Sequence, residues 1–380
     1  MDFNLSEEHL MIQQAARDFA IAELLPGVIE RDEHSKFPTE QVKMMAELGF
    51  LGMMVDPKYG GAGLDSVSYV LAMTEIAKVD ASAAVIMSVN NSLVCAGMEK
   101  YCSEEQKMKY LVPLAKGDVI GAFCLSEPEA GSDASSQKTT AKDMGDYYLL
   151  NGTKNWITNG NSASTYLVMA QTDVEKGHKG INAFIVEKGW AGFEIGPKEK
   201  KMGIRGSDTH TLLFNNVKVP KENILPNVEG LKGPLTCLNS ARYGISWGAV
   251  GAAMDCYESA RKYAAERIQF GKPIAGFQLT QKKLAEMLTE ITKAQLLAWK
   301  VGKMMNEGTA KTVHISMAKR NNVEMALNIA REARQIHGGM GITGEYPIMR
   351  HMMNLESVVT YEGTHDIHLL ITGMDVTGLN

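Results

Sequence analysis

The chain has 380 residues, of which 45% are hydrophobic, so it is globular and long enough for about two to three domains. Its 39 basic and 44 acidic residues give a formal net charge of -5, which argues against a nucleic-acid binder, because such proteins normally carry a basic stripe. The five cysteines show no C-x-x-C spacing, which argues against a disulfide framework and against a zinc site.

The N-terminus is acidic at Asp2, Glu7 and Glu8, where a signal or transit peptide would carry basic residues. No apolar run approaches the ~18 residues of a membrane span. Scattered cysteines also fit a reducing compartment. We therefore expect a cytoplasmic protein that does not enter a membrane.

Residues 1–118 are predicted to form an N-terminal helical domain. Ser6 is placed to cap the first helix, because acidic Glu7 and Glu8 follow it and apolar residues then recur at helical spacing. Pro26 and Gly27 end that pattern. Proline and glycine predict a loop over residues 56–63, and residues 66–98 are again compatible with helix.

Residues 119–228 are predicted to form a middle β domain. Short β-type runs are separated by turn residues such as Asn151-Gly152 and Asn159-Gly160. The runs cover residues 147–150, 166–170, 181–186 and 211–214. Because no crossover helices fall between them, we expect the sheet to be antiparallel.

Residues 229–380 are predicted to form a C-terminal helical bundle. Apolar residues recur on one face over residues 323–336. Gly244, Gly248 and Gly251 place small residues on one helix face, which predicts close approach of a neighbouring helix. Helices, a β block and more helices place the chain in the α+β class.

Glu362 is the strongest candidate for a catalytic group. It lies between the aromatic Tyr361 and the flexible Gly363, after the apolar residues 358–359. A partly desolvated carboxylate has a raised pKa and can act as a base near neutral pH. The alternative, for a glutamate considered alone, is an ordinary surface-loop residue.

Three other patterns carry less weight. Residues 339–344 match G-x-G-x-x-G, but a helical stripe precedes them, where a Rossmann site needs a strand. His365 and His368 are three residues apart with no third ligand nearby in the sequence, so we predict no metal site. The charges over residues 201–205 are expected to be solvated in a loop.

Five motifs occur in the order found in flavin-dependent acyl-CoA dehydrogenases, and together they resemble that family over essentially the whole chain. They are LSEPEAGSD at 125–133, NGTKNWITN at 151–159, RIQFGKP at 267–273, QIHGG at 335–339 and YEGT at 361–364. The resemblance implies the acyl-CoA dehydrogenase fold and bound FAD. It also implies a homotetramer, because Arg267 and Gln335 would serve FAD across a subunit contact, and an electron-transferring flavoprotein as electron acceptor.

The resemblance also implies roles for individual residues. Those expected around the isoalloxazine are Phe123, Leu125, Ser126, Trp156 and Thr158. Those expected at the ADP half of FAD are Arg267 on the pyrophosphate, with Phe270, Gln278, Gln335 and Gly339, while Thr364 and Asp366 open a helix whose N-terminus can receive phosphate. Those expected at the acyl-CoA are Ser132, Asn239, Arg242, Tyr361 and Gly363, with a structural ion pair as the alternative for Arg242.

In the mechanism that the resemblance implies, Glu362 removes the α-proton of an acyl thioester while the β-hydride moves to flavin N5. The Glu362 backbone N–H and a ribityl hydroxyl of FAD hold the thioester oxygen, so enolate charge is stabilised as it forms.

The two halves of the chain resemble different members of the family. The C-terminal half is similar to glutaryl-CoA dehydrogenases, and residues 85–93 are similar to short-chain (butyryl-CoA) dehydrogenases. Glutaryl-CoA dehydrogenases carry an Arg-Ser pair where this chain has Ala84 and Val85, and a glutamate where it has Ala77. Burying the distal carboxylate of glutaryl-CoA against Ala84 and Val85 without a cation would cost several kcal/mol. We therefore favour an unbranched acyl-CoA of about four carbons.

Two alternatives stay open. One is glutaryl-CoA dehydrogenase, which would decarboxylate its substrate oxidatively to crotonyl-CoA. The other is a flavoprotein of the same fold that serves as an oxidase or a binding protein; retention of Glu362, Trp156 and Arg267 argues against it.

Overall fold

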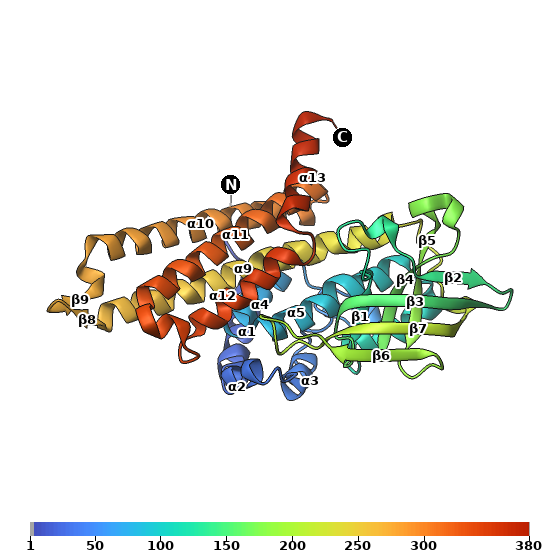
Figure 1. Cartoon of the computed structure of the whole chain (residues 1–380), viewed down its shortest axis with the longest axis horizontal. Helices are drawn as coiled ribbons and strands as arrows, with labels where there is room; N and C mark the ends of the chain where they lie inside the picture. The colour runs from blue at the N-terminus through green and yellow to red at the C-terminus, as the bar shows by residue number, and fades with distance from the viewer. Residues whose placement is uncertain (1–3, 380) are drawn as a thin grey trace.

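The computed structural model describes residues 4–379; residues 1–3 and 380 lie outside that range, together with the part of the acidic N-terminus that they contain. The predicted order of helices, strands and helices is confirmed (Figure 1). The boundaries at residues 118 and 228 stay a prediction.

The N-terminal part is helical, as predicted. Ser6 caps the first helix: its side chain accepts a hydrogen bond from the His9 backbone N–H at 3.2 Å, and the His9 ring accepts one from the Ser6 N–H at 3.3 Å. This reciprocal cap satisfies N–H groups that a helix start leaves unpaired. The helices are α1 (Glu7–Phe19), α2 (Val28–Glu33), α3 (Thr39–Glu47), α4 (Ser66–Val79), α5 (Ala81–Ser88), α6 (Ala96–Tyr101), α7 (Glu104–Gln106) and α8 (Val112–Lys116), with π-helical turns at Ala20–Leu24, Val89–Cys95 and Lys107–Leu111 and a 3-10 turn at Pro57–Tyr59.

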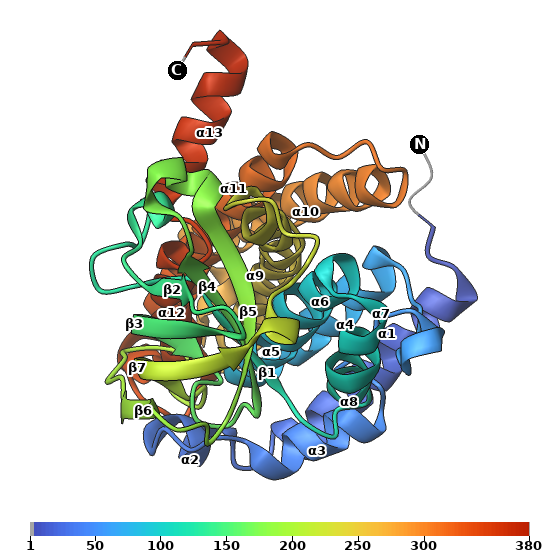
Figure 2. The same ribbon diagram turned by 90° about the vertical axis from the view of Figure 1, so that its right-hand side faces the viewer.

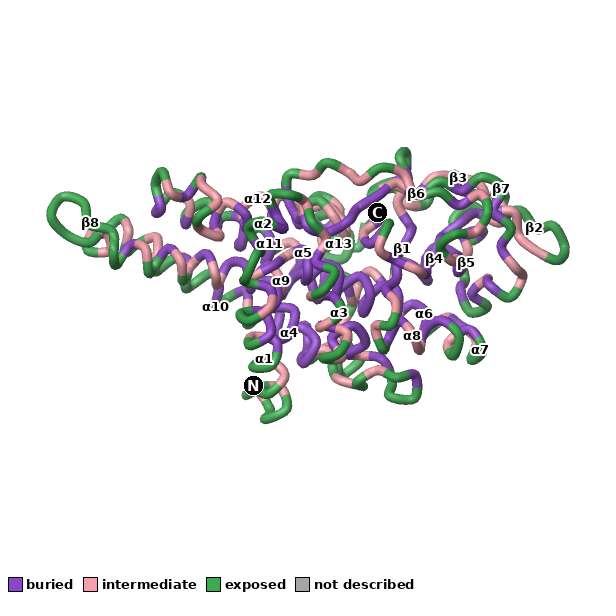
Figure 3. Tube along the Cα trace, turned by 90° about the horizontal axis from the view of Figure 1, so that it is seen from below, coloured by how far each residue is buried: buried purple, intermediate pink, exposed green. Residues whose placement is uncertain are grey.

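One helical stretch departs from the sequence analysis. Residues Ala81–Tyr101, which run from α5 through α6, are long and apolar enough to cross a membrane, with a mean hydropathy of 1.4. The prediction that no run approaches such a span was wrong, because scattered serine and asparagine residues hide the run from a search for uninterrupted apolar sequence. Within the described fold 89% of its most apolar window is buried, which makes it a core helix (Figure 3).

A buried amide connects this core helix to the sheet. Asn90 donates hydrogen bonds to the carbonyls of Leu51 at 2.8 Å and Leu114 at 3.1 Å, and its side-chain oxygen accepts one from the Gly121 N–H at 2.9 Å. Because Gly121 begins the first strand, the amide fixes where that strand leaves the helical layer.

The middle part is a seven-stranded sheet in the order β1-β4-β2-β3-β7-β6, with β5 also paired to β4. The prediction of a wholly antiparallel sheet was wrong, because β1 and β2 each pair with β4 in parallel. The absence of crossover helices constrains only strands that follow one another, whereas these pairs join strands separated by loops and other strands. The strands are β1 (Gly121–Cys124), β2 (Thr140–Asp143), β3 (Tyr147–Thr158), β4 (Thr165–Gln171), β5 (Ile181–Glu187), β6 (Phe193–Lys198) and β7 (Thr209–Pro220), with 3-10 turns at Ala134–Ser136, Val174–Gly180 and Lys221–Asn223.

The C-terminal part consists of long helices that run back along the molecule. Between α9 and α10 the short hairpin of β8 and β9 lies at the end opposite the sheet (Figure 1), and α13 projects from the body of the molecule (Figure 2). The predicted apolar stripe over residues 323–336 is buried on α11, as expected. The elements are α9 (Lys232–Glu266), β8 (Ile268–Gln269), β9 (Lys272–Pro273), α10 (Gln278–Asn306), α11 (Thr312–His337), α12 (Pro347–Thr360) and α13 (His365–Thr377), with 3-10 turns at Ile274–Gly276 and Gly338–Ile342.

Two hydrophobic cores meet at the sheet. Alternate residues of β4 face opposite sides, as strand geometry requires: Leu167 and Met169 join the large helical core, whereas Tyr166 and Val168 join a second core on the other face. Both faces of β4 are therefore covered, which explains why all seven of its residues are buried.

The predicted close approach at the glycines of α9 is confirmed against α4. A Cβ added at Gly244 would lie 2.9 Å from the Tyr69 ring, and one added at Gly251 would lie 2.4 Å from the carbonyl oxygen of Thr74. At Gly248 the nearest atoms, on Ala77 and Met73, would be 3.6 and 3.8 Å away, which is ordinary contact.

The Gly251→Ala substitution is expected to destabilise the protein by about 1–3 kcal/mol, because the methyl group would meet backbone that cannot move aside cheaply. Gly248→Ala is the matched control on the same helix; it has room for the methyl group and gains up to about 1 kcal/mol of helix propensity. Thermal unfolding of the two variants measures the difference, and equal midpoints would contradict the close approach of α9 and α4.

Candidate active site

Glu362 lies in the turn between α12 and α13, in a backbone conformation that a glutamate seldom adopts. Its φ is +54° and that of Gly363 is +96°. A Cβ at Gly363 would lie 2.9 Å from Nε2 of His368, so only glycine fits there. The Glu362 carbonyl accepts a hydrogen bond from Nε of Arg242 at 2.9 Å. We call residues 358–363 the base loop.

The Glu362 carboxylate is poised to exchange a proton near neutral pH. Its Oε2 atom is buried and has no hydrogen-bond partner among the described residues. This burial raises the pKa of Glu362 to about 7, although the nearby charges of Lys319 and Arg242 act to lower it. The sequence-based expectation of a partly desolvated carboxylate is thus confirmed, and the surface-loop alternative is wrong.

Sequence reasoning assigned no role to Lys319, although a signal existed. Lys319 precedes Val323 by four residues, so it falls on the same helix face as the predicted apolar stripe. It is fully buried on α11, and its Nζ donates to the carbonyls of Val358 and Gly363, both at 2.9 Å.

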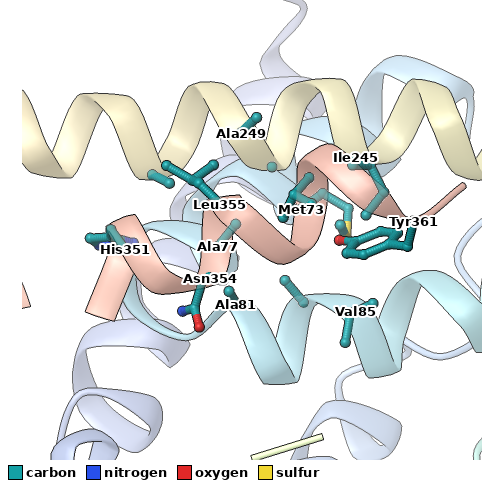
Figure 4. Close-up of a pocket in the computed structure, with 14 residues that line it drawn as sticks. Met73, Ala77, Ala81, Val85, Ile245, Ala249, His351, Asn354, Leu355 and Tyr361 are labelled. Atoms are coloured by element: carbon teal, nitrogen blue, oxygen red, sulfur yellow. The ribbon is translucent and has the colours of Figure 1, made fainter. Parts of the chain in front are cut away.

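An apolar cavity of about 30 Å³ opens beside Tyr361, between α4, α5, α9 and α12 (Figure 4). The structure brings the three positions that bear on the substrate, Ala77, Ala84 and Val85, into its lining. Lysine and arginine are absent from the described lining residues. The lining residues are Met73, Ala77, Ala81, Ala84, Val85, Ile245, Gly248, Ala249, Ala252, His351, Asn354, Leu355, Val358 and Tyr361.

His351 is a cavity-lining residue that the sequence analysis did not consider. Its Nε2 lies 2.9 Å from a carboxylate oxygen of Asp255, and its Nδ1 is buried without a partner among the described residues. Any positive charge on this imidazole is therefore already matched by Asp255.

The residues expected around the isoalloxazine are brought together by the loop that follows β1. Phe123 and Leu125 are nearly buried, and the Ser126 carbonyl accepts a hydrogen bond from the Asn155 N–H of β3 at 2.9 Å. Thr158 ends β3. Trp156, two residues earlier on the same strand, has 57% of its surface exposed and a φ of +61°. A large exposed aromatic in a strained conformation fits a position against a flat ring system.

Buried Lys154 holds this loop in place. Its Nζ donates to the Leu125 carbonyl at 3.0 Å, to Oε1 of Glu127 at 2.7 Å and to Oε1 of Gln137 at 3.1 Å. The Glu127 carboxylate also accepts from the backbone N–H groups of Lys138 and Thr139. The loop therefore has a preorganised shape before any ligand is present.

The residues expected at the ADP half of FAD form a separate group. Arg267 and Phe270 lie at the β8–β9 hairpin, and Phe270 is 95% exposed. Gln278 and Gln335 are exposed near the ends of α10 and α11, and Gly339 borders open space. This group lies at the end opposite the sheet (Figure 1 and Figure 3), so the structure does not bring it to Trp156 within one chain.

Arg267 makes no ion pair with any described residue, and its side chain lies at the surface, where a phosphate can reach it. Thr364 caps α13 by accepting a hydrogen bond from the Ile367 N–H at 3.3 Å, with Asp366 exposed in the first turn. The group around Trp156 and the group around Arg267 thus each fit one half of FAD, and we call them the two half-sites.

The residues expected at the CoA moiety are only partly close to one another. Asn239 and Arg242 lie one turn apart on α9, whereas Ser132 is exposed in the loop after β1. Asn239 donates to the Thr312 hydroxyl at 3.1 Å. Arg242 makes a structural contact, since its Nε donates to the Glu362 carbonyl, and its charge also acts on the Glu362 carboxylate, so the structural alternative stays open. Contact of these residues with CoA stays a prediction.

The patterns given less weight are placed as follows. Residues Gly338–Ile342 form a 3-10 turn after α11, with no strand before them, so the Rossmann interpretation fails as expected. Over residues 4–379 no group of three or more His, Cys, Asp or Glu is arranged to hold a metal. The expectation of solvated charges at 201–205 was wrong: Lys201 donates to the Ser207 carbonyl at 2.9 Å, and burial lowers its pKa to about 8.

Comparison with known proteins agrees with this geometry. Family models described as the N-terminal, middle and C-terminal domains of acyl-CoA dehydrogenase match residues 6–118, 122–217 and 229–377. A short-chain specific acyl-CoA dehydrogenase of Clostridium acetobutylicum is 42% identical over 98% of each chain.

Two solved structures are similar over nearly the whole chain. Butyryl-CoA dehydrogenase from Megasphaera elsdenii is 42% identical with a TM-score of 0.97, covering 99% of this chain and 100% of that one. Glutaryl-CoA dehydrogenase from Mycobacterium smegmatis in complex with FADH2 is 43% identical with a TM-score of 0.95, covering 98% of this chain and 95% of that one. A desolvated glutamate beside an apolar cavity is what proton abstraction from an acyl chain requires, and the chain belongs to the acyl-CoA dehydrogenase family of FAD-dependent oxidoreductases.

Proposed function

We propose that the protein oxidises a short, unbranched acyl-CoA of the butyryl class to the 2-enoyl-CoA, with Glu362 as the base that removes the α-proton. The observation that carries the proposal is the Glu362 pKa of about 7 beside an apolar cavity without lysine or arginine. A base with this pKa is matched to neutral pH.

The protein's own groups divide the work as follows. Glu362 accepts the α-proton, and Arg242 and Lys319 hold the carbonyls around it. No described residue accepts a hydrogen bond from the Glu362 backbone N–H, which leaves this donor for the thioester oxygen. Tyr361 and the cavity take the acyl chain and exclude water from the carboxylate. FAD, when bound by the two half-sites, supplies the acceptor for the β-hydrogen as hydride.

The cavity favours a short acyl chain over glutaryl-CoA. Overall identity does not decide, because both classes of enzyme are similar to this chain at 42–43%. A distal carboxylate would lie among Ala77, Ala84 and Val85 without a cation. His351 is already paired with Asp255, so burial of that carboxylate would cost several kcal/mol.

The two half-sites also bear on assembly. The sheet, whose strand β3 contains Trp156, and the β8–β9 hairpin, which follows Arg267, lie at opposite ends of the molecule (Figure 1), so a complete FAD site needs the second half from another copy. We infer a homotetramer in which Ser132, Asn239 and Arg242 face the CoA moiety. An electron-transferring flavoprotein as acceptor, which the family resemblance implies, and a cytoplasmic location, which the scattered cysteines indicate, complete the proposal.

The Glu362→Gln substitution is expected to lower kcat by about 10²–10⁴-fold, because an amide cannot accept the α-proton. FAD content should stay unchanged. Glu356→Gln is the matched control: this glutamate lies on the same α12–α13 segment but pairs at the surface with Arg331.

In the wild type, kcat/KM should rise with pH through about 7, since only the ionised Glu362 accepts a proton. A rise centred near the ordinary carboxyl value would contradict the assignment.

Substrate choice is tested by anaerobic bleaching of the flavin absorbance with butyryl-CoA and glutaryl-CoA in parallel, with the carbon count of each product determined. We expect bleaching by butyryl-CoA and little by glutaryl-CoA, because the cavity offers a carboxylate no cation. A double variant, Ala84→Arg with Val85→Ser, should gain bleaching by glutaryl-CoA and lose it with butyryl-CoA. Wild-type bleaching by glutaryl-CoA with a decarboxylated product would sink the short-chain assignment. No bleaching with either substrate, despite bound FAD, would favour a longer or branched acyl chain or the binding-protein alternative.

A further inference from the structure

Two lysines are completely buried among the described residues, and each lies under a loop of the candidate site. Lys154 lies under the loop after β1, and Lys319 lies under the base loop. Burying an ammonium group is costly unless its hydrogen bonds are satisfied. A buried lysine can hold backbone carbonyls through its hydrogen bonds, which an apolar side chain of the same size could not do.

Lys319 binds the base loop on both sides of Glu362. Its Nζ donates at 2.9 Å to the carbonyl of Val358, in the last turn of α12, and at 2.9 Å to the carbonyl of Gly363. Val358 is among the last four residues of α12, whose carbonyls have no partner within the helix. One ammonium group therefore ties the end of α12 to the residue that follows the base.

The tied segment is strained, so it needs such a constraint. Glu362 and Gly363 both have positive φ, a conformation that costs a non-glycine residue on the order of 1–3 kcal/mol unless its surroundings impose it. Arg242 holds the Glu362 carbonyl between the two carbonyls that Lys319 holds. Arg242 from α9 thus fixes the Glu362 carbonyl, and Lys319 from α11 fixes the carbonyl of the next residue, Gly363.

We propose that Lys319 is a positioning residue for Glu362: its ammonium group fixes the base loop at one carbonyl on each side of the base and places a positive charge next to the carboxylate. This inference rests on the proposed function of Glu362. It adds a second role to a residue that would otherwise serve only to hold α11 against α12.

The charged and titratable groups around Lys319 come from three other elements. They are Arg242 on α9, Glu362 in the base loop, and His365 and His368 on α13. Burial, together with the nearby charge of Lys319, lowers the pKa of both histidines, so they are mainly neutral at pH 7. Among these groups, Glu362 is the one carboxylate that the Lys319 charge can stabilise, and that charge acts to lower the Glu362 pKa. Burial in turn lowers the pKa of Lys319 to about 7, so the two groups titrate as a coupled pair, and the kinetic profile reports an apparent pKa of that pair.

The test compares Lys319→Met with Lys201→Met in the FAD-loaded full-length protein. Lys201 is the matched control because it is half-buried and ties a loop, through the Ser207 carbonyl and the Thr209 hydroxyl, without a hydrogen bond to the base loop. We expect Lys319→Met to lower kcat for butyryl-CoA by about 10²-fold with a smaller change in KM, as a misplaced base would. The apparent pKa in the kcat/KM profile should rise above about 7, because the charge that lowers the Glu362 pKa is gone. Lys201→Met should lower the unfolding temperature and leave both kinetic readouts unchanged.

Lys319→Gln covers the case in which the methionine variant does not fold. An amide can still donate to a loop carbonyl but carries no charge, so the variant should fold and still show the raised apparent pKa. Wild-type kcat and apparent pKa in a folded Lys319 variant, with only the unfolding temperature lowered, would overturn the inference. Failure of the wild type itself to oxidise butyryl-CoA would instead overturn the proposed function, so the two failures are distinguishable.

Discussion

The desolvated carboxylate of Glu362 is the constraint on which the rest of the site depends. Raising its pKa from 4.5 to about 7 corresponds to roughly 3 kcal/mol of lost ionisation free energy. Burial supplies that penalty, and the charges of Arg242 and Lys319 keep it from growing further. Without the two cations the base would stay protonated at neutral pH, and without the burial it would be too weak a base to remove an α-proton.

The fold serves this balance by bringing five helical elements to one site. Helix α9 supplies Arg242, α11 supplies Lys319, α12 and α13 close the loop, and the core helix Ala81–Tyr101 supplies the cavity wall at Ala84 and Val85. The flavin-side loop is fixed independently by Lys154. Both functional loops are thus held by buried ammonium groups that bind backbone carbonyls, which is consistent with sites that must be shaped before substrate arrives.

Much of this arrangement could be predicted from the sequence, because motifs mark chemistry and periodicity marks buried faces. The desolvation of Glu362, the close packing of Gly244 and Gly251 and the position of Ala84 and Val85 in one cavity agree with the sequence, while the roles of these residues stay predictions. The parallel pairing of β1 with β4 could not be predicted, since strand partners depend on how the loops between them run. Lys319 shows the same limit: the helix face reveals that a charge is buried, but its carbonyl partners lie about 40 residues away in the chain.

The most direct test of the account is an infrared difference titration of Glu362, taken as wild type minus Glu362→Gln in the absence of substrate. The carboxylic acid band isolated in this way belongs to one residue, whereas a kinetic profile reports every essential group. We expect the band to disappear with a midpoint near pH 7, as ionisation of a desolvated carboxyl requires. A midpoint near the ordinary value of 4.5 would contradict it, because Glu362 would then be a solvated carboxylate with no special basicity.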